Sequence, residues 1–164
     1  MDEELLCGLE NFEDVWRRVR GEAPPAVPAK TVQTPQAQSL CARMDEKCAQ
    51  SRLYAALARC CSPLRSELDC LAREERRQFR ALQLEYFLIT GACHSAGASC
   101  PCFTDVKSGL RMAWLQEKGS AAALERAALS AEETLRETLL RLAKEDAAHA
   151  RRLYALLQRS FCLG

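Results

Sequence analysis

Two pairs of polar residues stand where a helical protein normally has apolar side chains. Glu75 and Gln78 form one pair, Asp146 and His149 form the other, and the pairs lie seventy-one residues apart. Each pair interrupts a run of leucines at a four-three spacing, which is typical of the buried stripe of a helix. The repeated arrangement predicts two structurally similar halves that share a single polar site in the protein interior.

Two further polar residues fall on predicted inward stripes. Lys47 lies seven residues before Tyr54, and Glu117 lies seven residues before Leu124, in segments that match at a shift of seventy residues. Side chains at this spacing share one face of a helix. Each of four predicted helices therefore contributes at least one polar group to the interior.

The residue types at these positions are those that bind metal ions. Glu75, Glu117 and Asp146 would repel one another in a core of low dielectric constant unless they were protonated or neutralised by a cation. Carboxylates with one imidazole suit iron, manganese or zinc. The i, i+3 spacing of Asp146 and His149 lets both side chains reach one ion. These four residues are the predicted metal ligands.

The helices that position these residues are separated by proline and glycine. An amphipathic helix is predicted over residues 3–20 and is ended by Gly21, so residues 1–21 form an N-terminal accessory helix. Residues 22–38 contain four of the six prolines, which is the composition of an extended linker. Residues 39–162 form the main domain.

Four long helices are predicted in the main domain. Their expected bounds are residues 39–60, 63–90, 106–129 and from 130 onward. A capping box of Ser130 and Glu133 opens the fourth helix. The connections are short, long and short, and the long one, over residues 91–108, joins the second and third helices. This order predicts an all-α four-helix bundle with a long crossover, plus the N-terminal accessory helix.

The composition limits the classes of function. The chain has 164 residues, with 23 Lys and Arg against 22 Asp and Glu, so no net charge attracts nucleic acid. It has no run of about eighteen apolar residues, and its acidic start lacks the basic region of a secretory signal. We therefore expect a soluble cytoplasmic protein that binds neither nucleic acid nor membrane, in which the ten cysteines are reduced thiols.

The long crossover holds a second candidate site. Cys93, His94, Cys100 and Cys102 would supply the ligand types of a tetrahedral zinc site, but their spacing is poor. A redox pair of Cys100 and Cys102 is another interpretation. Incidental thiols in an irregular segment are the third.

Residues 39–162, about three quarters of the chain, resemble the rubrerythrin-type di-iron domain of the ferritin-like superfamily. The stretches 71–82 and 142–153, together with residues 86–91, carry the resemblance. In that family two helices each supply a Glu and two each supply a Glu-x-x-His. The C-x-x-C pairs of the rubredoxin-type iron site that accompanies many rubrerythrins are absent from this sequence.

The metal-ligand positions of the family are only partly kept. The helix-one Glu and the helix-two His are terminal ligands of the same iron in the family, and these positions hold Lys47 and Gln78 here. The resemblance therefore implies that one metal position is disabled, with the Lys47 ammonium filling the space and the charge of the lost ion. One iron ion or none is expected rather than two, and zinc and manganese are the alternatives. The remaining position would draw on Glu75, Glu117, Asp146 and His149.

The function implied by the resemblance is metal binding, with peroxidase-like non-haem iron oxidoreductase chemistry on peroxide or oxygen. No catalytic residue is assigned. An alternative is a metal-free four-helix scaffold that acts as a protein-interaction module, in which Lys47 and Glu75 form a buried ion pair. The expected partners are a second copy of the chain in a homodimer and an electron-donor or other protein.

Overall fold

The computed structural model of the chain describes residues 34–97 and 101–162. The predicted helix at residues 3–20 and the linker up to residue 33 lie outside the described residues. In the described part every regular element is helical, and four of the helices are long. None of them combines the length and the apolar character that crossing a membrane requires. The predicted all-α, four-helix organisation is confirmed.

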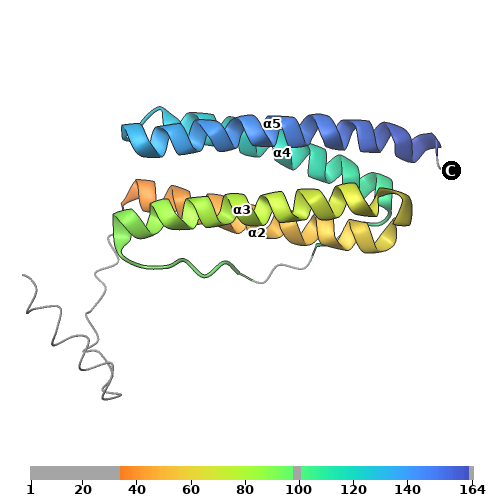
Figure 1. The fold of residues 1–164 in the computed structure, drawn as a ribbon, viewed down its shortest axis with the longest axis horizontal. Coiled ribbons are helices and arrows are strands. Elements are labelled where there is room, and N and C mark those ends of the chain that lie inside the picture. Colours follow the sequence, from red (N-terminus) through yellow and green to blue (C-terminus); the bar gives the residue numbers. More distant parts are fainter. Residues whose placement is uncertain (1–33, 98–100, 163–164) are drawn as a thin grey trace, which may run out of the picture. The chain divides into compact units, whose positions relative to one another are not determined.

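The four long helices pack as two pairs. α2 (Pro35–Cys60) packs on α3 (Arg65–Thr90), and the short 3-10 helix η1 (Ser62–Leu64) joins them. α4 (Val106–Ala128) packs on α5 (Glu133–Cys162). In Figure 1 the two helices of each pair lie side by side. Each pair is a helical hairpin, and the polar stripes face the space between the two hairpins.

Helix α2 begins at a local capping signal. The Thr34 side chain accepts a hydrogen bond of 3.1 Å from the Ala37 backbone N–H, and Pro35 follows at the start of the helix. Proline is favoured there because the first helical N–H has no partner within the helix. α2 therefore begins four residues before the predicted start at Ser39.

The start of α5 differs from the prediction. α5 begins at Glu133, so Ser130 lies in the preceding turn rather than at the helix cap. The Arg136 side chain donates to the carbonyl of Ala128 at 3.2 Å and to that of Ala131 at 2.8 Å. This guanidinium, together with the burial of Ala131, holds the turn against the bundle in place of a capping box.

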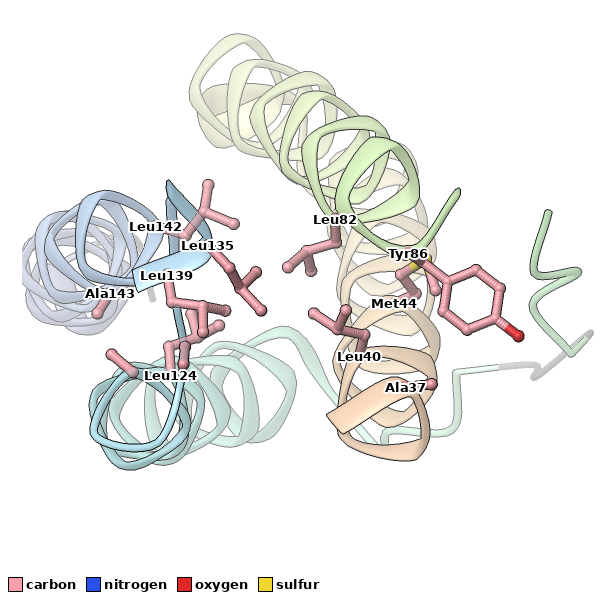
Figure 2. Packing of buried hydrophobic residues seen from close by; sticks show 12 residues of the cluster. Ala37, Leu40, Met44, Leu82, Tyr86, Leu124, Leu135, Leu139, Leu142 and Ala143 are labelled. Carbon is pink, nitrogen blue, oxygen red and sulfur yellow. The ribbon is translucent and has the colours of Figure 1, made fainter. Parts of the chain in front are cut away.

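Two clusters of buried apolar side chains lie along the helices, with polar residues between them. Figure 2 shows Leu40 of α2, Leu82 of α3 and Leu139 of α5 directed toward one another in the first cluster. The second cluster includes Leu53 of α2 and Leu153 of α5. The buried polar layer between them consists of the predicted site residues Lys47, Glu75, Gln78, Glu117, Asp146 and His149. Apolar layers on both sides keep this polar layer away from water.

The four-three spacing of Leu110, Trp114 and Glu117 predicts that Trp114 lies on the inward stripe of α4, and this prediction is wrong. In α4, Ala113 is fully buried, whereas Trp114 is only half-buried and its ring lies 6.0 Å from that of Tyr154. A Cβ atom added to Gly109, one turn earlier, would lie 2.6 Å from Leu57 Cδ2 of α2. α4 approaches α2 so closely here that only small side chains fit between them.

We expect Leu142→Ala to lower the free energy of unfolding by about 2–5 kcal/mol, because it removes a fully buried side chain and leaves a cavity. Leu140→Ala is the matched control. Leu140 lies on the same helix and is 40% exposed, so its loss should change the free energy of unfolding by only about 0.5 kcal/mol. Chemical denaturation measures both values. Equal losses in the two variants would contradict the assignment of the inward face of α5.

Candidate metal centre

Four predicted ligands come together in the polar layer. Glu75 of α3, Glu117 of α4, and Asp146 and His149 of α5 are all buried. Each offers one ligand atom, and these four atoms all lie within 4.8 Å of one another. This buried cluster of carboxylates and an imidazole could hold a metal ion.

The ammonium group of Lys47 lies among these carboxylates. Lys47 Nζ is 2.6 Å from Asp146 Oδ2 and 3.2 Å from Glu75 Oε2, and all three side chains are fully buried. Burial by itself would lower the pKa of Lys47, but the charges of Glu75, Asp146 and Glu117 raise it above its usual value. Lys47 is therefore charged inside the cluster, and it forms the buried ion pair with Glu75 that the metal-free alternative predicts.

The imidazole of His149 faces carboxylates at both nitrogens. Its Nδ1 lies 2.7 Å from Glu75 Oε1, inside the cluster. Its Nε2 lies 2.9 Å from Glu74 Oε2, and Arg152 donates to the same oxygen at 2.5 Å. In metal sites a carboxylate on the outer nitrogen fixes the orientation and the tautomer of a ligating histidine. Sequence reasoning did not assign this role to Glu74, because Glu74 lies one position outside the inward stripe of α3.

The Tyr54 hydroxyl donates a short hydrogen bond to Glu117 Oε1. Burial and the nearby carboxylates of Glu117 and Glu75 raise the pKa of Tyr54 well above its usual value, so the phenol keeps its proton and remains a donor. From its helical spacing Tyr54 is predicted to be a core residue, with a position near the site as the alternative. Its position seven residues after Lys47 on the same stripe was the signal that it reaches the site.

Gln78 is buried in the same layer but turns to a different partner. Its Nε2 donates to Glu145 Oε2 at 3.1 Å, and its Oε1 has no hydrogen-bond partner. Arg77 also pairs with Glu145 Oε2, at 3.1 Å. The Gln78 side chain therefore supplies no imidazole nitrogen to the cluster, and its amide nitrogen is directed to Glu145.

The ionisable groups nearly balance in charge without a metal. Burial would lower the pKa of His149, but hydrogen bonds to Glu117 and Glu75 and their charges raise it from 6.5 to about 10. Burial raises the pKa of Glu117 and of Asp146, against the lowering effect of His149 and Lys47 respectively. Three carboxylates therefore face two cations, and full ionisation leaves one negative charge in excess.

Two carboxylate oxygens in the cluster lack partners. Glu117 Oε2 and Asp146 Oδ1 are buried and accept no hydrogen bond. A buried acceptor that is left unsatisfied costs about 1–3 kcal/mol. A bound cation would contact both oxygens and neutralise the excess negative charge.

The described residues of the cysteine-rich segment do not form a zinc site. His94 Nε2 lies 2.9 Å from Asp45 Oδ1, so this imidazole is paired with a carboxylate of α2. Cys93 and Cys102 are exposed free thiols, and Cys100 lies outside the described residues. The cluster around His149 is the one group of potential metal ligands found within residues 34–97 and 101–162.

The raised pKa of His149 predicts how the stability of the metal-free protein depends on pH. A folded-state pKa of about 10 against 6.5 in the unfolded chain means that the stabilisation is complete below pH 6.5 and is lost as the pH rises to about 10. The free energy of unfolding should fall across this range by an amount on the order of a few kcal/mol.

Urea denaturation at several pH values tests this expectation. His149→Gln should lack most of the decrease, because glutamine does not titrate, whereas His94→Gln should retain it. The same slope in wild type and His149→Gln would contradict the assignment.

Comparisons with protein-family models, with curated proteins and with solved structures found no match. The functional interpretation of the cluster therefore rests on its own geometry and charge.

Proposed function

We propose that this protein binds one divalent transition-metal ion in the core of its helical bundle, through Glu75, Glu117, Asp146 and His149. The observation that carries the proposal is the convergence of four buried ligand atoms from three helices within 4.8 Å. Carboxylates with an imidazole suit iron, manganese or zinc, and iron is the ion that the resemblance to rubrerythrins favours.

The proposal includes a ferritin-like topology of the rubrerythrin type. In such a bundle the segment between the second and third helices runs along the bundle. Two contacts support this path. His94 lies 2.9 Å from Asp45, and the Arg52 side chain donates to the Gly97 carbonyl at 2.6 Å, so the segment after α3 meets α2 at two places.

The side chains of this protein prepare the site in three ways. Glu74 accepts from His149 Nε2, which directs Nδ1 into the cluster once the imidazole has lost a proton. Tyr54 holds Glu117 in place through its hydroxyl. The leucine layers exclude water. A bound iron ion would supply electrons to peroxide or oxygen, which is the peroxidase-like oxidoreductase chemistry implied by the resemblance.

Lys47 limits the site to one ion. Its ammonium supplies the positive charge that a second cation would bring, and it lies close to Asp146 and Glu75. The Gln78 amide donates to Glu145, so residue 78 provides no imidazole ligand for a second ion. Any ion must therefore compete with the Lys47 ammonium and with the proton on His149 for the same carboxylates.

A metal-free interaction module is a second candidate, and the charge balance supports it. Lys47 and the protonated His149 already neutralise most of the buried negative charge. On the outside, Tyr154 and Phe161 of α5 are 49% and 66% exposed, and the ammonium of Lys107 lies 4.8 Å from the centre of the Phe161 ring. Exposed aromatic side chains of this kind are typical of surfaces that bind another protein or a second copy of the chain.

Metal analysis after anaerobic loading with Fe(II) tests the first candidate. We expect about one iron ion per chain in the wild type and none in His149→Ala, because the imidazole is the one nitrogen ligand of the cluster. His94→Ala is the control, since it removes the other of the two histidines and leaves the cluster intact. Absence of bound iron, manganese and zinc from the wild type would instead support the metal-free module.

The role of Lys47 predicts a gain of metal in a double variant. Lys47→Glu with Gln78→His restores the carboxylate and the imidazole of a second position, so binding should rise from about one ion to about two per chain. Isothermal titration and metal analysis measure the change. Gln78→His alone is the matched control and should stay at one ion, because the ammonium remains. If the double variant binds no more metal than the wild type, Lys47 is not a substitute for an ion.

A further inference from the structure

A groove of about 480 Å³ runs between α4 and α5 on the outside of the bundle. At one end the ring of Trp114 lies 6.0 Å from the ring of Tyr154. Farther along, the floor of the groove consists of small apolar side chains from both helices: Ala121, Ala122, Ala147 and Ala150. The groove is therefore apolar at its base, and an apolar side chain from another molecule could lie close to both helices.

The groove is part of a longer surface that both helices share. Lys107 of α4 lies 4.8 Å from the centre of the Phe161 ring of α5, so the outward stripes of the two antiparallel helices run side by side. Residues three or four apart lie on one face of a helix, and at 1.5 Å per residue the α4 stripe is about 27 Å long. We call this surface the α4–α5 face. Its members are Lys107, Arg111, Trp114, Lys118, Ala122 and Glu125 of α4, and Lys144, Ala147, Arg151, Tyr154, Gln158 and Phe161 of α5.

The α4–α5 face is strongly basic. It carries five lysines and arginines and one acid, Glu125, although the whole chain has a net charge of only +1. All five cations are exposed, and none of them forms an ion pair within residues 34–97 and 101–162. A two-fold dimer through this face would bring like charges together, which opposes self-association. The complementary partner is therefore negatively charged and is not a second copy of the chain.

The aromatic rings of the face suit protein side chains better than nucleobases. Single-stranded nucleic acid stacks its bases on the ring faces of a basic groove. Here the Lys118 ammonium lies 4.8 Å from the centre of the Trp114 ring, and Lys107 covers Phe161 in the same way. These ammonium groups occupy ring faces on which bases would stack. A flat lipid surface would reach the cations at the rim but not the alanine floor of the groove.

We propose that the α4–α5 face binds an acidic amphipathic α-helix of a partner protein. A helix fits a groove between two others, and the alanine floor lets its apolar side chains approach closely. Acidic residues along the two edges of that apolar stripe pair with Lys118 on α4 and Arg151 on α5. Tyr154, which is 49% exposed, supplies an aromatic anchor of the kind that dominates binding at protein interfaces. The binding uses no residue of the candidate metal centre, so it stands or fails independently of metal binding.

The test measures the binding of labelled helical peptides to the full metal-free chain by fluorescence anisotropy. Each peptide has about 18 residues, which matches the length of the face. The acidic peptide carries leucine on one side and glutamate along both edges of that side. A basic peptide has lysine in place of each glutamate, and a third has the acidic composition with its leucines spread around the helix. The acidic peptide should bind at least about tenfold more tightly than either of the others.

Three outcomes of this titration would overturn the proposal. The first is absence of binding of the acidic peptide, and the second is equal affinity for all three peptides. The third is displacement of the acidic peptide by an equal concentration of a single-stranded oligonucleotide or of phosphatidylserine in vesicles. That result would assign the face to nucleic acid or to an anionic membrane instead.

A reversal of charge locates the binding. Lys118→Glu with Arg151→Glu should weaken the acidic peptide at least about tenfold and should strengthen the basic peptide, because both rim charges change sign. Arg73→Glu with Arg80→Glu is the matched control, since it changes the net charge equally at exposed positions of α3. The control should leave both affinities unchanged. An equal loss in the two double variants would show that net charge alone attracts the peptide, and the α4–α5 face would lose its role.

A variant of the floor tests whether the peptide enters the groove. Ala122→Leu should weaken the acidic peptide at least about fivefold, because the larger side chain fills the space that the partner's apolar side chains need. Ala123→Leu is the control, because Ala123 follows on the same helix but faces α2 rather than α5. Circular dichroism checks that both variants keep the helical fold. Unchanged affinity in a folded Ala122→Leu variant would show that the peptide binds elsewhere.

Discussion

The structure depends on the neutralisation of carboxylates in the middle of the bundle. Taking an ion out of water costs several kcal/mol even after the protein relaxes, and only close partners offset that cost. Glu75 meets this requirement through two cations, since His149 approaches one of its oxygens and Lys47 the other. Asp146 has the Lys47 ammonium, and Glu117 has the Tyr54 hydroxyl. Removing one of these partners would leave a buried charge without compensation.

Three hydrogen bonds of the cluster join one helical hairpin to the other. Lys47 of α2 meets Asp146 of α5, Glu75 of α3 meets His149 of α5, and Tyr54 of α2 meets Glu117 of α4. Leucine layers can slide past one another with little change in buried area, but hydrogen bonds and ion pairs require one alignment. The polar layer therefore sets the register of the two hairpins, while the apolar clusters on either side supply most of the stabilisation.

The same geometry supports both a metal site and a balanced, metal-free core. With the imidazole protonated, the protein supplies its own cations, and one negative charge remains in excess. With the imidazole neutral, its Nδ1 and the free oxygens of Glu117 and Asp146 offer lone pairs to an ion. Protons and metal ions therefore compete for one set of atoms, so metal binding would release protons and strengthen as the pH rises.

The periodicity of the sequence by itself determined the four helices and which side chains face inward, because a buried stripe must repeat at the helical period. It also placed Lys47, Glu75, Glu117, Asp146 and His149 in one interior layer. Only the tertiary structure decided which atoms meet: the Glu74 carboxylate outside His149, the turn of Gln78 toward Glu145, and the close approach at Gly109 that moved Trp114 off the stripe. These contacts join residues on different helices, and periodicity along one helix carries no information about distances between helices.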